Sequence, residues 1–288
     1  MSTMLTVSNL SKSFGENTIL SNINFEIKSG DIVGLIGKNG SGKTTLMKMI
    51  LGFIPITDGE ILFQGDSNYF SHKKMLSKIG FLLDCKLFDD FTGYDNLKLF
   101  SMYAPKHQTR NIDQDIKNLL EFVGLENNKK IVKSYSFGMK QRLGLALALL
   151  DNPEFLILDE PFVGLDPVGV RTLLDYIKKL RDEKGVTVLI SSHQLHEIEE
   201  ICDYFLFVNE KKIEVHKGVA DYQLTITIEK MSQELRTCLT TLVDVNQNTI
   251  KILNDTRLLN EILKTIYSLH GEIQSIQIEP TIEELFRR

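Results

Sequence analysis

The segment GLIGKNGSGKTTLMKMI, residues 34–50, limits what this chain can fold into more than any other part of it. It places four glycines between an apolar run and a sequence with the spacing of a helix. Residues 37–44, GKNGSGKT, fit the pattern G-x-x-x-x-G-K-[ST]. Glycines let successive backbone N–H groups turn inward toward oxygen atoms, and the helix start adds partial positive charge. The segment therefore predicts a phosphate-binding loop between a buried strand and a helix.

The residue types in this loop indicate a nucleotide with β- and γ-phosphates, bound with a metal ion. Lys43 would neutralise the β- and γ-phosphates, and the Thr44 hydroxyl would bind Mg²⁺. A glycine-rich turn with a solvated lysine is the alternative, and the flanking strand and helix weigh against it. The residues of this loop expected to contact the nucleotide are Gly37, Lys38, Asn39, Gly40, Ser41, Gly42, Lys43, Thr44 and Thr45.

Two acids at the end of a second apolar run, FLILDEP, would complete such a site. Asp159 is expected to hold Mg²⁺, and Glu160 to polarise the attacking water as general base. Acids that merely cap a strand and begin a turn before Pro161 are the alternative. The phosphate loop upstream favours the catalytic interpretation.

The composition is that of an ordinary globular protein, with 42% apolar and 25% charged residues in a chain of 288. That length allows one large domain or two unequal ones. The net charge of −5 and the scattered lysines weigh against a nucleic-acid-binding face. The three cysteines are far apart and form no metal-ligand pair or disulfide framework, so we expect reduced thiols in a cytosolic protein.

Apolar runs in the sequence are too short to cross a membrane. None approaches the roughly 20 residues that a spanning helix needs, and LGLALALL is the longest. The start, MSTMLTVSNLSKSF, lacks the basic cluster and the apolar core of a secretion signal. We therefore expect the protein to stay inside the cell and to reach a membrane only through a partner.

Secondary-structure patterns change along the chain. Helical spacing is dense over about 71–150, which we interpret as a helical insert. EFLILDEPF and VTVLISSHQ are continuous apolar runs, as in parallel strands buried on both faces. Beyond a boundary near Gly218 the pattern is β-α-β-α-β. The sequence thus predicts an α/β domain over residues 1–218 and a small α+β accessory domain over 219–288.

Between the loop and the acids lies YSFGMKQRLGLALALL, and with it residues 3 to about 218 resemble the ATP-binding subunits of ABC transporters. Against the L-S-G-G-Q signature of that family, Ser136 and Gly138 are kept, while Phe137 and Met139 replace a glycine and the glutamine. The resemblance implies that Ser136 and the backbone at Gly138 grip the γ-phosphate of a nucleotide held by the opposite subunit. A helix start can play that part.

Further landmarks follow in the order of this family. VGLDP resembles the D-loop, with Asp166 at the subunit contact, and LISSHQ gives His193 as the histidine expected to hydrogen-bond the γ-phosphate. Phe14 sits where an aromatic ring stacks on adenine. Taken alone, the phenylalanine would be a core residue and the histidine a surface one. The implied fold is the P-loop NTPase ABC cassette, with a RecA-like core around a parallel sheet, an antiparallel β subdomain and a helical subdomain.

One departure from the family is chemical. Asp84, in IGFLLDCKLF, occupies the place of the Q-loop glutamine, which touches the nucleotide-bound Mg²⁺. A carboxylate there adds negative charge near the phosphates unless the metal offsets it. A loop acid at a misaligned position is the alternative. An acid here, with SFGMKQRLGLALALL and FTGYDNL, resembles the bacitracin-resistance and lantibiotic self-immunity exporters of Gram-positive bacteria.

The resemblance implies an ATPase that drives export of an antibiotic or peptide through separate integral membrane permease subunits. Lys43, Glu160 and His193 are the expected catalytic residues, and a second copy of the chain would supply the signature in a head-to-tail homodimer. Residues 84–91 are the expected docking edge for the permease. The protein would associate peripherally with the cytoplasmic face of a bacterial cell membrane.

Two other functions stay open. A single-cassette ABC ATPase could act on ribosomes or DNA, although the acidic net charge and the absence of a second cassette or a long coiled coil weigh against it. The second alternative is a regulatory subunit that binds ATP but hydrolyses it weakly. Asp84, Phe137 and Met139 would then mark the loss of catalysis. The presence of Lys43 and Glu160 argues against the latter.

Overall fold

The computed structural model describes residues 2–83, 86–103, 111–193, 195–217, 222–253 and 256–280. The chain divides into two compact units, Met1–Lys217 and Gly218–Arg288. No helix among the described residues is both long enough and apolar enough to span a membrane.

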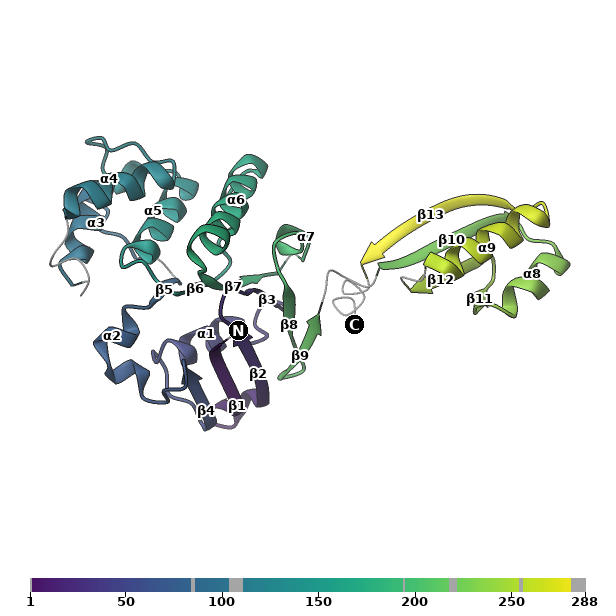
Figure 1. The fold of residues 1–288 in the computed structure, drawn as a ribbon, viewed down its shortest axis with the longest axis horizontal. Helices are drawn as coiled ribbons and strands as arrows, with labels where there is room; N and C mark the ends of the chain where they lie inside the picture. Colours follow the sequence, from purple (N-terminus) through teal and green to yellow (C-terminus); the bar gives the residue numbers. More distant parts are fainter. Residues whose placement is uncertain are drawn as a thin grey trace. The chain divides into compact units, whose positions relative to one another are not determined.

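A six-stranded sheet of order β5-β6-β7-β3-β8-β9 forms the centre of the first unit (Figure 1). The first five strands run parallel, and β9 pairs antiparallel with β8. Every residue of β3, β6 and β7 is buried, which explains their continuous apolar sequences. The strands are β3 Ile32–Ile36, β5 Ile79–Leu82, β6 Phe155–Leu158, β7 Thr187–Ser192, β8 Tyr204–Asn209 and β9 Lys212–Lys217.

Helices continue the chain directly from the carboxyl ends of these strands. After β3 comes α1, Lys43–Ile50, after β6 comes α6, Pro167–Lys184, and after β7 the short α7, Leu195–Ile198. This strand-to-helix alternation brings the ends of β3, β6 and β7 to one edge of the sheet, because parallel neighbours end on the same side. Lys43, Thr44, Asp159, Glu160 and His193 come together at that edge.

An antiparallel sheet of order β2-β1-β4 packs beside the central sheet. Its strands are β1 Thr3–Phe14, β2 Asn17–Lys28 and β4 Asp58–Phe63. Alternate residues of β2 are buried, and they share one hydrophobic core with β3 and α1. The turn between β1 and β2 places Phe14 at an exposed corner.

A group of helices forms the third part of the first unit, with α3, α4 and α5 together in Figure 1. Thr92 starts α3 with a capping box, and Ser136 caps α5. The range predicted as a helical insert also holds β5, a four-residue strand of the central sheet. The elements are η1 Tyr69–Ser71, α2 Lys73–Leu76, α3 Gly93–Ser101, α4 Ile112–Phe122, η3 Val132–Ser134 and α5 Phe137–Leu149.

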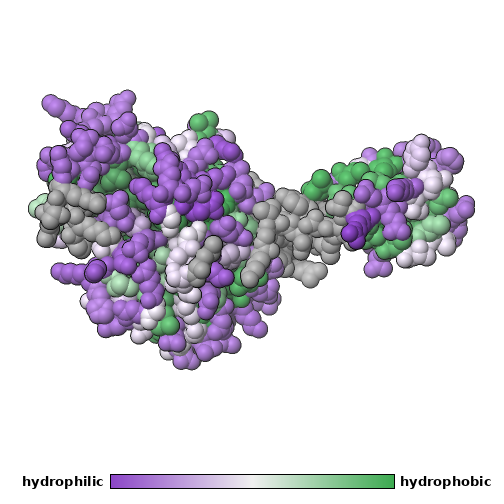
Figure 2. Space-filling model, in the orientation of Figure 1, coloured by the Kyte–Doolittle hydropathy of each residue, from purple (hydrophilic) through white to green (hydrophobic). Residues whose placement is uncertain are grey.

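The second unit has the order β-α-β-β-α-β, with a four-stranded antiparallel sheet β11-β12-β10-β13. The sequence pattern predicted one strand fewer, because β11 has only two residues and shows no alternation. Ile262 and Ile266 of the last helix are buried in the core, whereas Ile276 and Ile278 of β13 are exposed. Figure 2 shows a hydrophobic area on the surface of this unit. The elements are β10 Tyr222–Lys230, α8 Gln233–Thr240, β11 Val245–Asn246, β12 Thr249–Leu253, α9 Thr256–Ser268 and β13 Glu272–Pro280.

Candidate active site

The loop between β3 and α1 has the backbone geometry that the glycines predicted. Gly40 and Gly42 have φ of 81° and 111°, in the left-handed region that favours glycine. At Gly37 a Cβ atom would lie 2.6 Å from Ser41 Oγ and 2.7 Å from the Val208 carbonyl oxygen. A side chain at Gly37 would therefore push the loop away from the sheet.

Lys43 points into this loop. Its side chain is only 6% exposed, and Nζ donates a hydrogen bond of 2.6 Å to the Gly37 carbonyl oxygen. The same ammonium lies 3.4 Å from Oε1 of Glu160. The lysine is thus shared between the loop that precedes its own helix and the acid that follows β6.

Asp159 joins three elements at the edge of the sheet. Its Oδ2 accepts a hydrogen bond of 2.6 Å from the Thr44 hydroxyl on α1, and its Oδ1 accepts one of 2.6 Å from the Ser191 hydroxyl on β7. The Ser191 hydroxyl also accepts the backbone N–H of Glu160 at 2.8 Å. Ser191 thereby fixes both acids, and sequence reasoning missed it; its position at the end of a buried strand that pairs with β6 was the available signal.

Glu160 is held between two basic side chains. Its Oε2 lies 2.7 Å from Nδ1 of His193, and its Oε1 faces Lys43. Its backbone φ of +47° is unusual for a residue with a side chain, and conformations of that kind concentrate at functional sites. The Glu160 side chain is 24% exposed, while its Oε1 atom is buried. The structure therefore brings Lys43, Glu160 and His193 together.

The donors at this edge fit a phosphate-bound Mg²⁺ ion. The Thr44 hydroxyl and the Asp159 carboxylate are hard oxygen ligands, and Mg²⁺ in such sites takes one or two carboxylates with substrate phosphates and water. The part of the chain that the structure describes holds no group of three or more acidic, histidine or cysteine side chains for a metal. The Ser41 hydroxyl oxygen is buried there without a hydrogen-bond partner among the described residues, which suits an oxygen-rich ligand.

The other loop residues line the same turn. Lys38, Asn39 and Gly40 are exposed, and Thr45 is half-buried at the start of α1. Phe14, the residue expected to stack on adenine, is 52% exposed, with Lys12 Nζ 4.6 Å from its ring centroid. About half of this side chain is therefore open to solvent. Asp84 lies outside the described residues, so its expected metal and nucleotide contacts remain a prediction.

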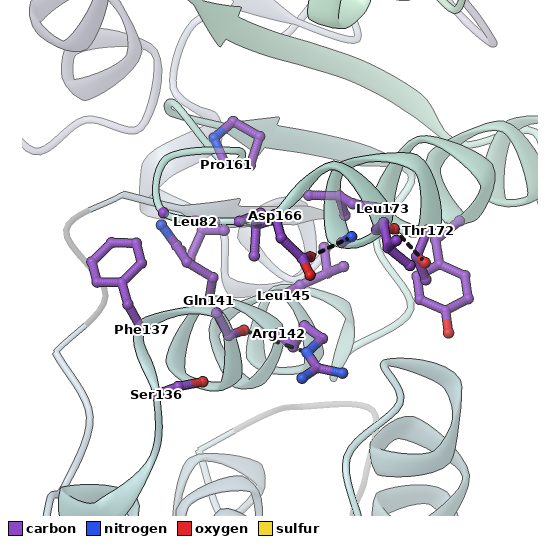
Figure 3. A pocket seen from close by; sticks show the side chains of 16 residues that line it. Leu82, Ser136, Phe137, Gln141, Arg142, Leu145, Pro161, Asp166, Thr172 and Leu173 are labelled. Atoms are coloured by element: carbon purple, nitrogen blue, oxygen red, sulfur yellow. Dashed lines mark hydrogen bonds between the residues drawn. The ribbon is translucent and has the colours of Figure 1, made fainter.

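The signature residues and Asp166 lie in a second group, around a cavity of about 470 Å³ between α5 and α6 (Figure 3). Ser136 caps α5, and its hydroxyl accepts the Met139 N–H at 3.3 Å. Asp166 caps α6, and its Oδ1 accepts the Gly169 N–H at 2.8 Å. Gly138 and Asp166 both line this cavity, whereas Lys43 and Thr44 do not.

Comparison with known proteins identifies the family of the chain. The family profile described as ABC transporter matches residues 20–163, and a profile described as an AAA domain, putative AbiEii toxin, type IV toxin–antitoxin system, matches residues 131–199. The lantibiotic transport ATP-binding protein SrtF of Streptococcus pyogenes is 41% identical over 74% of this chain and 90% of its own. The bacitracin transport ATP-binding protein BcrA of Bacillus licheniformis is 40% identical over 74% of this chain and 69% of its own.

A solved structure supports the same fold. The protein cbiO1 of Clostridium perfringens, part of the ABC transporter complex cbiONQ, superposes with a TM-score of 0.67 at 30% identity, over 76% of this chain and 89% of its own. The predicted fold and the resemblance read from the motifs are confirmed by these matches. The chain belongs to the family of ABC transporter ATP-binding subunits.

Proposed function

We propose that this chain binds and hydrolyses Mg·ATP and powers the export of an antibiotic or peptide through separate membrane subunits. The observation that carries the proposal is the meeting of Lys43, Asp159 and Glu160 at one edge of the sheet, beside a glycine loop that admits no side chain at Gly37. The names of SrtF and BcrA, both peptide-antibiotic transport proteins, support the substrate class.

Each residue of the site has a separate role in the transfer of the γ-phosphoryl group to water. The loop N–H groups and Lys43 bind the triphosphate, and the ammonium exchanges its Glu160 contact for phosphate oxygens. Glu160 then takes a proton from the attacking water, and His193 hydrogen-bonds the γ-phosphate. Mg²⁺, held by Thr44 and Asp159, would supply charge neutralisation on the phosphate oxygens.

A second copy of the chain completes each site in this proposal. Ser136, Gly138 and Asp166 gather around the cavity between α5 and α6, and none of them takes part in the hydrogen bonds of Asp159 or Glu160 described above. The N-terminus of α5, which Ser136 caps, carries partial positive charge that suits the γ-phosphate of a nucleotide on the other copy. The proposed assembly is a head-to-tail homodimer.

A groove of about 610 Å³ beside β5 and α5 is the proposed contact with the permease. Phe81, Phe100 and Tyr103 line it, with exposed fractions of 41%, 38% and 84%. Phe88 and Phe91, on the docking edge expected from sequence, are also about half exposed. Exposed aromatic clusters of this kind are typical of protein interfaces. A permease segment in this groove would hold the protein at the cytoplasmic face of the membrane.

Glu160→Gln tests the assignment of the base. The amide keeps the shape of the side chain but cannot accept a proton, so we expect Mg·ATP binding to persist, a nucleotide-bound dimer to accumulate and phosphate release to stop. Glu154→Gln, at the opposite end of β6, is the matched control and should hydrolyse normally. Normal turnover by Glu160→Gln would refute the base assignment, and absent turnover in wild type with its permease would favour a regulatory subunit.

For the second unit we propose an accessory role, in dimer contact or regulation. It has its own hydrophobic core, so removing it should leave the first unit folded. We expect a chain ending at residue 217 to bind ATP with its affinity unchanged but to differ in dimerisation or turnover. Unaltered ATPase activity, dimerisation and permease binding would dispose of both roles.

A further inference from the structure

The ring of Phe137 sits directly on Gly164. A Cβ atom built on Gly164 would lie 2.3 Å from Cδ1 and 2.8 Å from Cε1 of that ring. Beside it, a Cβ atom on Gly138 would lie 3.1 Å from Cδ2 of Leu165. Two consecutive residues at the start of α5 therefore pack on two consecutive residues of the segment that leads into α6. Figure 3 shows Phe137 and Gln141 projecting from α5 toward the cavity, with Pro161 on the opposite side.

Burial alone does not account for this contact. Phe137 remains 54% exposed, so its ring gains little from being removed from water. It covers the backbone of Gly164, whose φ is +75°. A glycine is thus needed at position 164 for two reasons: the backbone is left-handed there, and the Phe137 ring occupies the space of a Cβ atom.

The contact between Phe137 and Gly164 joins two segments that are proposed to serve different nucleotides of the dimer. On one side, Phe137 follows Ser136, the cap of α5 that is proposed to serve the nucleotide of the second copy. On the other side, the turn from residue 160 to 165 is closed by the hydrogen bonds of Val163 N–H to Glu160 O, 3.3 Å, and Leu165 N–H to Phe162 O, 3.0 Å. The ring therefore touches a short turn that begins at the proposed base.

We propose that Phe137 is a positioning residue that links the start of α5 to the turn after Glu160, so that the base of one ATP site and the signature of the other move together. This inference rests on the proposed homodimer. A glycine at position 137, as in the L-S-G-G-Q pattern, has no side chain for such a link. The link would make engagement of one nucleotide favour the other.

Fluorescence tests the contact without nucleotide. The chain contains no tryptophan, so Phe137→Trp introduces a single reporter at this position. Adding Gly164→Ala should displace the indole, shift its emission to longer wavelength and raise its quenching by acrylamide at least about twofold, because a Cβ atom cannot share its space. Gly185→Ala, at the other end of α6, is the matched control: its φ is +65° but nothing lies within 4 Å of its Cβ position. Equal emission and quenching in the two variants would overturn the contact.

Phe137→Ala tests the positioning role. We expect its affinity for Mg·ATP to stay within about twofold of wild type, while ATP-driven dimerisation in the Glu160→Gln background weakens about tenfold, since an unanchored signature must be ordered on association. The Hill coefficient for ATP hydrolysis should fall toward one, and Phe137→Leu, which keeps an apolar contact, should restore most of it. Wild-type dimerisation and cooperativity in Phe137→Ala would overturn the role. A wild-type chain that binds no ATP would refute the proposed function instead, and the fluorescence result would still decide whether the ring packs on Gly164.

Discussion

The Lys43 ammonium lies 3.4 Å from Oε1 of Glu160, in a pair whose side chains are 6% and 24% exposed. Without nucleotide, the Lys43 ammonium, which would bind phosphate, thus pairs with the Glu160 carboxylate, which would activate water. A triphosphate that draws the ammonium into its own oxygen shell leaves Glu160 with His193 and solvent. The pairing offers a physical reason why the base would become available only after nucleotide has entered the loop.

Lys43→Ala should abolish nucleotide binding. The substitution removes the cation that compensates phosphate charge, and it leaves the Glu160 carboxylate facing the loop with repulsion toward ATP. Isothermal calorimetry with Mg·ATP should show affinity reduced by at least about a hundredfold, roughly 3 kcal/mol. Lys48→Ala, on the same helix but outside the loop, should bind as wild type does. Undiminished heat from Lys43→Ala would contradict the phosphate loop itself.

Thr44→Val should uncouple nucleotide binding from Mg²⁺. The variant keeps the size of the side chain but loses the hydroxyl that bonds Asp159 and would bind the metal. We expect ATP affinity in EDTA to match wild type and affinity in excess Mg²⁺ to fall about tenfold. Thr44→Ser should behave as wild type. If Mg²⁺ strengthens binding equally in Thr44→Val and wild type, the metal lies elsewhere.

Much of this site was predictable because its residues are local in sequence. The phosphate loop lies within eight positions, and its glycines at 37, 40 and 42 and the lysine at 43 predict it. The acids of FLILDEP follow a strand that the continuous apolar run before them predicts. Parallel pairing of β3 with β7 and of β6 with β7 then brings them to one edge. The local sequence pattern was therefore sufficient to predict the site residues that lie close together in the sequence.

The features missed by sequence reasoning depend on long-range register. Ser191 contacts both acids only because Leu158 pairs with Ile190, a register that no local pattern encodes. In the sequence, Phe137 is only a mismatch to the L-S-G-G-Q signature. Its packing on Gly164 depends on how α5 and the segment before α6 fold against each other. The short strands β5 and β11, of four and two residues, likewise fall below the length at which alternation is visible.

Ser191→Ala should slow hydrolysis more than it weakens binding. Its hydroxyl donates to Asp159 and accepts the N–H of Glu160, so its loss leaves that N–H unpaired and frees the base to move. We expect kcat to fall about tenfold with ATP affinity within about twofold of wild type. Ser192→Ala removes an equally buried hydroxyl that donates to Glu197, and it should retain turnover. Parallel losses in the two variants would indicate a general effect of the strand end.

Cys202 should be unreactive in the folded protein. Burial, with a smaller contribution from Asp203, raises the pKa of this thiol well above its usual range, and the thiolate is the reactive form. In a Cys85→Ser background, native protein should react with a thiol reagent at the exposed Cys238 and at Cys202 only after unfolding. Because the unfolded thiol ionises near about pH 8.5, the unfolding free energy should decline as pH rises above that value, and less so in Cys202→Ala. Rapid labelling of Cys202 at neutral pH would contradict its burial.

Asn96 is the buried polar residue on which the proposed docking edge depends. Its Oδ1 accepts the Phe88 N–H at 2.9 Å, and its Nδ2 donates to the carbonyl oxygens of Phe88 and Thr92 at 3.1 and 2.9 Å. Asn96→Asp cannot donate those two bonds and buries a charge, so urea unfolding should show a loss of about 2–4 kcal/mol. Asn118→Ala, an exposed asparagine on α4, should change stability by less than about 0.5 kcal/mol.

The effect of Asn96 on partner binding separates stability from docking. At temperatures where Asn96→Asp is still folded, its Mg·ATP affinity should equal that of wild type, because the phosphate loop and its acids lie on other elements. Binding of permease in detergent should nevertheless weaken, since Phe88 and Phe91 present their rings from the segment that Asn96 holds. Full permease binding by a folded Asn96→Asp would place the docking surface away from Phe88 and Phe91, in the part of the groove around Phe81.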